Sequence, residues 1–246
     1  MKERPLIPAA DMLARLEAAA WTRGLGLAPE TLAQLARYVE LLAAANRRFN
    51  LTAIRDAAGM EQLHLCDSLM LLPFVDRAPA GPLLDVGSGA GLPGLPLAIA
   101  RPGRRICLLE SMTRRADFLR GTAADLGLGN IRVIAARAEE AAHDPGLRER
   151  FALVTARAVA PLGTLVELCV PYLQPDGIFV AMKSADPDEL AAAERAIQAL
   201  RVRLAERQDY EIPGAGKPRC LLVFRRTGSL PQRFPRPLAQ IRRGPP

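Results

Sequence analysis

The chain has 246 residues, half of them hydrophobic, and a formal net charge of +7. This length suits one large domain or one domain with a small appendage, and the apolar fraction is enough to bury a sizeable core. Four scattered cysteines without a CxxC pair, together with only two histidines, argue against a disulfide scaffold and against a metal site of the zinc type.

The first 80 residues are expected to form a helical cap, because no strand-like alternation is found before residue 82. A helix is predicted to start at Pro29 and to end near Asn46, with apolar residues at helical spacing between them. Another is predicted over residues 60–72, closed by Pro73. The N-terminus lacks a long apolar run, and the apolar stretch 83–100 contains Asp, Gly and Pro. We therefore expect a cytoplasmic protein without a membrane segment.

From residue 82 onward, predicted strands alternate with helices, which is typical of a parallel sheet covered on both faces. The last helix is predicted over residues 186–205. The loop 213–218 is too short for a crossover helix, so the last two strands are expected to form an antiparallel hairpin. Residues 81–226 are thus expected to form one α/β domain. The predicted strands cover residues 83–86, 105–110, 130–136, 151–156, 177–183, 207–212 and 219–225.

The C-terminal end carries the basic excess of the chain. Residues 212–246 contain eight basic residues and no acid, a charge of +8 against +7 for the whole chain. Such a segment commonly serves a polyanion, usually nucleic acid, and the alternative is a solvated tail that keeps the protein soluble. We predict that residues 227–246 form a tail, rich in Pro and Arg, which is either disordered or spread over the surface.

A glycine-rich turn between a strand and a helix lies at residues 83–94, which read LLDVGSGAGLPG. Such a turn lets a ligand lie against bare backbone. Gly89, Gly91 and Gly94 match the GxGxxG pattern of nicotinamide-binding proteins, and Glu110 stands about where their ribose-binding acid belongs. An NAD-dependent oxidoreductase is therefore one hypothesis.

The glycine pattern of this turn can also be counted from Gly87, two residues before Gly89. Asp85 stands two residues before Gly87, which gives DxGxGxG, and the predicted terminal hairpin does not fit a second nucleotide-binding half. The combination resembles the class I methyltransferase fold, a Rossmann-like fold that binds S-adenosylmethionine. Small residues would let the methionine part lie on the turn, Glu110 would accept from the ribose hydroxyls, and Asp85 would add negative potential near the ammonium and the sulfonium.

Each of these acids also has a plain structural interpretation. Asp85 could cap the turn, and Glu110 could be an exposed carboxylate at a strand end. Glu139 follows the third strand, where it could recognise the adenine amino group or simply be one of two acids at a helix start.

The residues after the fourth strand bear on the methyl acceptor. Residues 155–158 read TARA, not the Asn/Asp-Pro-Pro-aromatic tetrad that holds an exocyclic amine, and no paired cysteines suit attack at carbon five of a pyrimidine. Arg157 suits guanine, whose O6 and N7 are the acceptors that arginine reads best, although it could equally be a salt-bridge arginine. Attack by N7 needs alignment and no general base.

Seven segments together resemble one family, the RsmG (GidB) family of bacterial methyltransferases that act on N7 of a guanine in small-subunit (16S) ribosomal RNA. They cover residues 46–56 (NRRFNLTAIRD), 64–69 (HLCDSL), 83–102 (LLDVGSGAGLPGLPLAIARP), 108–111 (LLES), 137–140 (RAEE), 156–162 (ARAVAPL) and 181–184 (AMKS). The resemblance implies an enzyme whose partner is 16S rRNA or the small ribosomal subunit.

The resemblance also implies roles for individual residues. Gly87 and Leu92 would contact the cofactor from the first turn, and Ala138 and Glu139 would contact its adenosine part. Arg157 would lie at the edge between cofactor and substrate. Lys183 would lie near the mouth of the active site, where it and Arg157 would position the substrate. We expect a monomer without a metal ion. A non-catalytic RNA-binding factor, suggested by the basic tail, is the remaining alternative.

Overall fold

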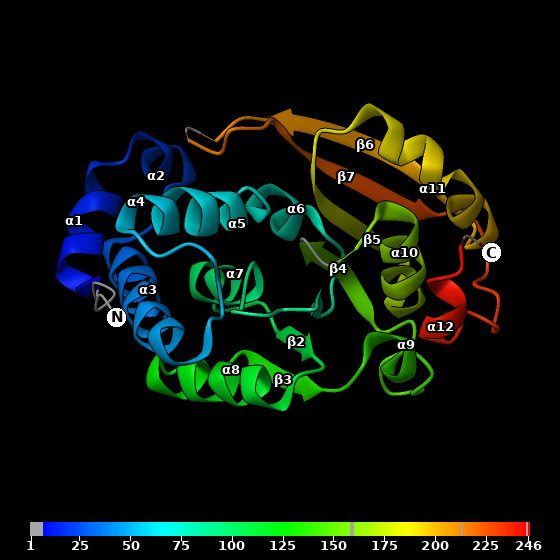
Figure 1. Cartoon of the computed structure of the whole chain (residues 1–246), viewed down its shortest axis with the longest axis horizontal. Coiled ribbons are helices and arrows are strands. Elements are labelled where there is room, and N and C mark those ends of the chain that lie inside the picture. The colour runs from blue at the N-terminus through cyan, green and yellow to red at the C-terminus, as the bar shows by residue number, and fades with distance from the viewer. Residues whose placement is uncertain (1–6, 158–159, 213, 245) are drawn as a thin grey trace.

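The computed structural model describes residues 7–157, 160–212, 214–244 and 246. Its centre is a seven-stranded sheet in the order β3-β2-β1-β4-β5-β7-β6 (Figure 1). Neighbouring strands run parallel from β3 to β5, whereas β7 is antiparallel to both β5 and β6. The predicted parallel sheet with a terminal antiparallel hairpin is confirmed. The strands are β1 (Leu83–Val86), β2 (Ile106–Glu110), β3 (Ile131–Ala135), β4 (Phe151–Arg157), β5 (Leu173–Ser184), β6 (Val202–Tyr210) and β7 (Arg219–Arg226).

Two hydrophobic cores lie on the two faces of this sheet. Successive residues of a strand point to opposite faces, so Leu83 of β1 belongs to one core and Leu84 to the other. Every residue of β1 and β2 is buried, as expected for central strands covered on both sides. Helices from the N-terminal region and from after β1 and β2 pack on the first face, and the later helices pack on the second.

The N-terminal region is helical, as predicted. Its helices are α1 (Ala9–Ala18), α2 (Ala20–Leu25), α3 (Pro29–Phe49), α4 (Ala57–Gly59), the π-helical segment η1 (Met60–Cys66), α5 (Asp67–Leu69) and α6 (Leu72–Arg77). The prediction that Pro73 closes a helix was wrong. It lies in the first turn of α6, a position where the missing N–H of proline has no helical partner to lose.

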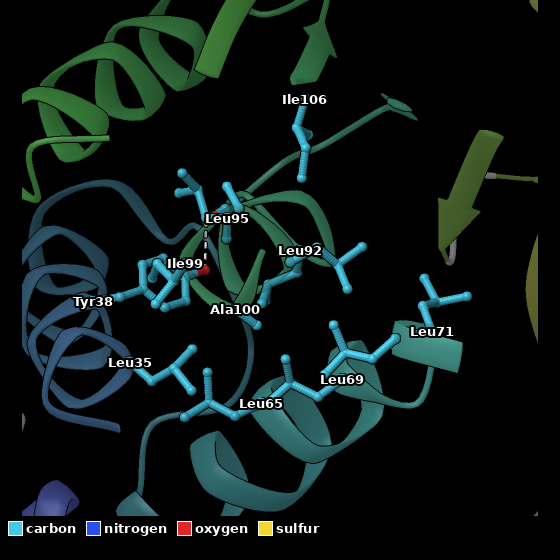
Figure 2. Packing of buried hydrophobic residues seen from close by; sticks show 14 of the residues in the cluster. Leu35, Tyr38, Leu65, Leu69, Leu71, Leu92, Leu95, Ile99, Ala100 and Ile106 are labelled. Carbon is cyan, nitrogen blue, oxygen red and sulfur yellow. Dashed lines mark hydrogen bonds between the residues drawn. The ribbon is translucent and has the colours of Figure 1, made fainter. Parts of the chain in front are cut away.

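The cap and the sheet share one core. Figure 2 shows side chains of α3, η1 and α5 meeting those of α7 (Gly94–Ala100), the helix that follows the glycine-rich turn. Tyr38 of α3 is fully buried, and its hydroxyl donates to the carbonyl oxygen of Ala90 at 2.9 Å. The cap therefore fixes the backbone of the turn directly.

The remaining helices cover the rest of the sheet. They are α8 (Thr113–Asp125), α9 (Ala138–Ala141), α10 (Leu162–Cys169), the 3-10 segment η2 (Val170–Tyr172), α11 (Pro187–Ala199) and α12 (Leu238–Ile241). The prediction that the last long helix reaches residue 205 was wrong, because α11 stops at Ala199. Arg201 adopts a left-handed backbone with φ of 52°, which reverses the chain so that β6 begins at Val202.

The C-terminal segment packs on the surface of the second core. Phe234 is fully buried, and α12 lies beside α9 and α10 (Figure 1). Arg236 forms a bidentate pair with the buried Glu167, with 2.8 Å for both Nε to Oε1 and Nη2 to Oε2. Of the two alternatives predicted for the tail, the described residues follow the surface-packed one. No helix in the described ranges has both the length and the apolar character to cross a membrane.

Candidate functional site

The glycine-rich turn leaves β1 at the carboxyl edge of the sheet. Gly87, Gly89 and Gly91 have φ values of 72°, 58° and 92°, which L side chains rarely adopt. The backbone N–H of Gly87 donates to the Leu109 carbonyl at 2.8 Å, so the turn is tied to β2. A Cβ on Gly94 would overlap a methyl group of Leu108, because α7 packs close against the sheet. The turn thus presents bare backbone for geometric reasons.

Asp85 lies beneath this turn and is fully buried. Its Oδ2 accepts from the Gly94 N–H at 3.0 Å, while Oδ1 has no hydrogen-bond partner in the described part of the chain. Burial raises the pKa of this carboxyl from 3.8 to about 7, against a smaller lowering effect of the Gly94 hydrogen bond. This geometry matches the turn-capping interpretation, with one carboxyl oxygen left over.

Glu110 ends β2 and holds the outer side of the turn. Its Oε2 accepts from the Gly89 N–H at 2.9 Å, and its Oε1 accepts from the Met112 N–H at 2.8 Å. Only 4% of the residue is exposed, so the alternative of an ordinary exposed carboxylate was wrong. A carboxylate offers about four lone-pair positions, and two of them stay available for further donors.

Two adjoining cavities meet at the turn and share Gly87 and Ser111. One has a volume of about 340 Å³ and is mostly apolar, with Val86, Leu109, Ala138 and Glu139 in its wall. The other has about 380 Å³ and is mostly polar; its wall contains Gly87, Gly89, Leu92, Glu110, His64 and Arg157. Apart from Asp85, Gly91 and Lys183, every residue that the sequence predicted for the site lines one of these two cavities.

The apolar cavity is closed by Glu139 and by the backbone of Ala138. Glu139 lies in the first turn of α9 and is 8% exposed; its Oε1 lies 2.5 Å from Nε of Arg137. The Tyr172 hydroxyl donates to the Ala138 carbonyl at 2.6 Å, which fixes this backbone. Glu139 is therefore both a helix-start acid and part of the cavity wall.

Arg157 ends β4 and reaches into the polar cavity. Its Nη1 donates to the Leu63 carbonyl at 3.0 Å and to Asp67 Oδ2 at 2.9 Å, so the salt-bridge interpretation is correct. Arg157 also lines the polar cavity, so it can be a salt-bridge arginine and part of the site wall at once. Ala158, next along the chain, lies outside the described residues.

Lys183 lies near the carboxyl end of β5. Its Nζ donates to the Ala160 carbonyl at 3.0 Å and lies 2.5 Å from Oε1 of Glu189. The side chain lines neither of the two cavities, and its partner Ala160 lies in the wall of the apolar one. Arg157 thus lines the polar cavity, whereas a role for Lys183 at the mouth of the active site stays a prediction.

Asp67 is a site residue that sequence reasoning missed. It is fully buried and accepts from Arg157, from Nη1 of Arg219 at 3.2 Å and from the hydroxyl of Tyr210 at 2.7 Å. One carboxylate thus joins the cap to β4, β6 and β7. The segment 64–69 contains this aspartate within apolar residues, and a charge in that setting was the available signal.

His64 is a second missed residue, one helical turn before Asp67. Its Nε2 lies 2.8 Å from Thr52 Oγ1, and its Nδ1 lies 3.1 Å from the Leu63 carbonyl oxygen. Burial, followed by the charge of Arg157, lowers the pKa of His64 to about 4, so the ring is neutral at pH 7. Two residues of the tail, Leu238 and Arg242, were missed as well, and they line the apolar cavity.

The strand order and the glycine turn after β1 define the fold of class I S-adenosylmethionine-dependent methyltransferases. Among solved structures, the CcbJ methyltransferase from Streptomyces caelestis matches with a TM-score of 0.53 and 17% identity, covering 67% of this chain and 90% of that one. The glycopeptide N-methyltransferase MtfA, complexed with S-adenosyl-L-methionine, matches with a TM-score of 0.50 and 16% identity, covering 65% and 87%. At these identities the similarity concerns the fold.

The chain belongs to the GidB family, rRNA small subunit methyltransferase G, whose model matches residues 31–212. The ribosomal RNA small subunit methyltransferase G of Chloroflexus aggregans is 42% identical over 227 residues, which cover 92% of this chain and 94% of that protein. The protein of the same name from Roseiflexus sp. is 42% identical over 236 residues, covering 96% and 99%. The predicted family and fold are confirmed, and neither an NAD-dependent oxidoreductase nor a non-catalytic RNA-binding factor is favoured.

Proposed function

We propose that this protein transfers the methyl group of S-adenosylmethionine to N7 of a guanine in small-subunit (16S) ribosomal RNA. The observation that carries the proposal is the pair of cavities meeting at Gly87, with the Arg157 guanidinium fixed at the rim of the polar one. Family membership supports ribosomal RNA as the substrate. The cavities support a cofactor with one apolar and one polar half.

The residues present fit this cofactor. Gly87 and Gly89 offer a backbone surface that a side chain would fill, and the free lone pairs of Glu110 suit a ribose diol. Ala138 and Glu139 would hold the adenosine part in the apolar cavity, and Leu92 would contact the methionine part. The unpaired oxygen of Asp85 suits a nearby positive charge. When bound, the cofactor supplies a methyl group on a sulfonium.

The polar cavity suits an acceptor that needs no deprotonation. Guanine N7 carries a lone pair and no proton, so the protein has only to align it with the methyl group. Arg157 would donate to O6 or N7 of the base, the acceptors that a guanidinium reads best. Both ring nitrogens of His64 have partners, and the ring is neutral at pH 7, so it would act as a fixed wall.

Methyl transfer to unmodified ribosomal RNA tests the proposal. The purified protein is incubated with labelled S-adenosylmethionine and with small ribosomal subunits, or free 16S rRNA, that lack the modification. We expect label at one guanine, with chain cleavage by aniline after reduction marking N7. Label on another atom, or no label in RNA, contradicts the proposal. A Gly87→Val variant, whose side chain would fill the cofactor surface, serves as the inactive control.

We further propose that the protein acts as a cytoplasmic monomer and without a metal ion. Light scattering during gel filtration would then give a mass near 26.6 kDa. Methyl transfer in the presence of a chelator such as EDTA would proceed at the rate measured without it.

A further inference from the structure

A groove of about 820 Å³ lies between α3 and α8, outside the two cavities described above. Its floor is apolar and formed in part by Ala44, Ala45 and Phe118. Phe49, the last residue of α3, lines it and is only partly buried, so part of its ring is accessible. The cofactor site does not use this groove.

Arginines surround the aromatic ring. The Cζ atom of Arg48 lies 5.1 Å from the ring centroid of Phe49, and that of Arg114 lies 5.3 Å from it. Arg47 lines the groove next to Arg48. All three arginines are exposed, and none forms a salt bridge with a described carboxylate. They are therefore free to meet anions from outside.

The acids in the groove do not cancel this charge. Asp117 also lines the groove, but its Oδ1 is already paired with Nη1 of Arg120 at 2.8 Å. Asp125 is the other acid in the wall, and it lies at the opposite end of α8 from Arg114. The end of the groove that contains Phe49 is thus positively charged.

Residues of this positive end are close in sequence to residues of the polar cavity. Leu51 lines the polar cavity and follows Phe49 by two residues, and Arg115 lines the polar cavity and follows Arg114 directly. A strand that leaves the polar cavity beside these residues would enter the groove. An aromatic face with arginines beside an apolar floor is the arrangement by which proteins hold single-stranded nucleic acid.

We propose that this groove binds a single-stranded stretch of the substrate RNA next to the target nucleotide. A base would stack on Phe49 in place of a guanidinium group that lies over the ring, and Arg47, Arg48 and Arg114 would contact the phosphates on either side. The proposal rests on the proposed function for the identity of the RNA. In the basic tail, by contrast, Arg236 is already held by Glu167, so we expect the groove to contribute more phosphate contacts than the tail.

Two variants test the groove against one matched control. Arg48→Ala/Arg114→Ala removes two groove charges, and Arg195→Ala/Arg203→Ala removes two exposed charges from α11 and β6 without touching the groove. Phe49→Leu keeps an apolar side chain and removes the stacking face. For each protein, the affinity for the unmodified RNA is measured at several salt concentrations, together with the affinity for S-adenosylmethionine and the melting temperature.

We expect the groove double variant to bind RNA about tenfold or more weakly and to lower the slope of log K against log salt by about 1.4, because each phosphate contact to a single strand contributes about 0.7. Phe49→Leu should weaken RNA binding by at least about fivefold, since stacking on an aromatic side chain is worth about 1–3 kcal/mol per base. Affinity for S-adenosylmethionine should not change.

The proposal is overturned if the groove variants bind RNA with the affinity and salt slope of the unaltered protein, or if the control pair causes an equal loss. These binding measurements do not depend on methyl transfer. A protein that binds RNA through the groove but transfers no methyl group would contradict the proposed function and leave the groove supported.

Discussion

Asp85→Asn tests whether the buried carboxyl under the glycine turn only caps the turn or also supplies negative charge for the cofactor. Burial raises the pKa of Asp85 to about 7, whereas in the unfolded chain it is near 3.8. Between these values the folded protein holds the proton more tightly, so the free energy of unfolding falls as the pH rises. A shift of about three units corresponds to a cost of about 4 kcal/mol, complete above pH 7. Asparagine keeps an acceptor for the Gly94 N–H and carries no charge.

His64 titrates in the same range with the opposite sign. Its pKa is lowered to about 4 in the folded protein, so the unfolded chain binds the proton more tightly and stability rises with pH between about 4 and 6.5. The unaltered protein and the Asp85→Asn variant both contain His64, so the difference between their free energies of unfolding depends on Asp85 alone. We expect the variant to gain about 4 kcal/mol relative to the unaltered protein between pH 4 and pH 7.5.

Urea unfolding at half-unit pH steps measures this difference. If the difference between the two proteins does not change with pH, the assignment of a raised pKa to Asp85 is refuted. Calorimetry with S-adenosylmethionine in buffers of different ionisation enthalpy then tests the electrostatic role. The cationic cofactor should favour the ionised carboxyl, so binding near pH 6.5 should release a proton from the unaltered protein and not from the variant. Equal release from both would leave Asp85 as a turn cap only.

Three further perturbations have expected outcomes. Gly91→Ala forces an L side chain to a φ of 92° and into Leu95, so the melting temperature should fall by several degrees, and an unchanged value would contradict the strained turn. Asp67→Asn leaves two arginines without their shared carboxylate and should lower the free energy of unfolding in urea by about 3–5 kcal/mol; a loss below 1 kcal/mol would show that the cluster is not stabilising. Removal of residues 227–246 opens the apolar cavity and should weaken binding of S-adenosylmethionine about five- to tenfold by calorimetry, through roughly 1 kcal/mol of lost apolar contact. The same truncation should leave the salt slope of RNA binding nearly unchanged, whereas a large drop would return the tail to the role of RNA contact.

The sheet and its turn were predictable because their signals are local. A short apolar strand, a run of glycines and an apolar helix follow one another within residues 83–100. Each of these elements can be predicted from its own residues, without knowledge of the rest of the chain. The antiparallel hairpin of the last two strands was predictable because the loop 213–218 is too short for a crossover helix. The end of α11 was predicted too late, because the left-handed backbone of Arg201 carries no sequence signal of its own.

The polar cluster and the tail could not be predicted in the same way. Asp67 lies 90 residues from Arg157, and its other partners are more than 140 residues away. Pairing across such distances depends on the strand order, which places β4 and β7 on either side of β5. By composition the tail was predicted to be disordered or spread over the surface, and the fully buried ring of Phe234 shows that it is part of the second core.

The proposed function requires the two adjoining cavities to receive both a cation and a polyanion, and acidic and basic groups lie on different sides of them. Asp85 and Glu110 lie under and behind the glycine turn, and a bound ammonium and sulfonium would favour the ionised form of Asp85. On the opposite wall, Asp67 satisfies Arg157 and Arg219 with a single negative charge, which leaves this wall net positive. Because Asp67 belongs to the cap, the cap holds Arg157 in place and determines how much positive charge remains on the side that would face RNA under the proposed function.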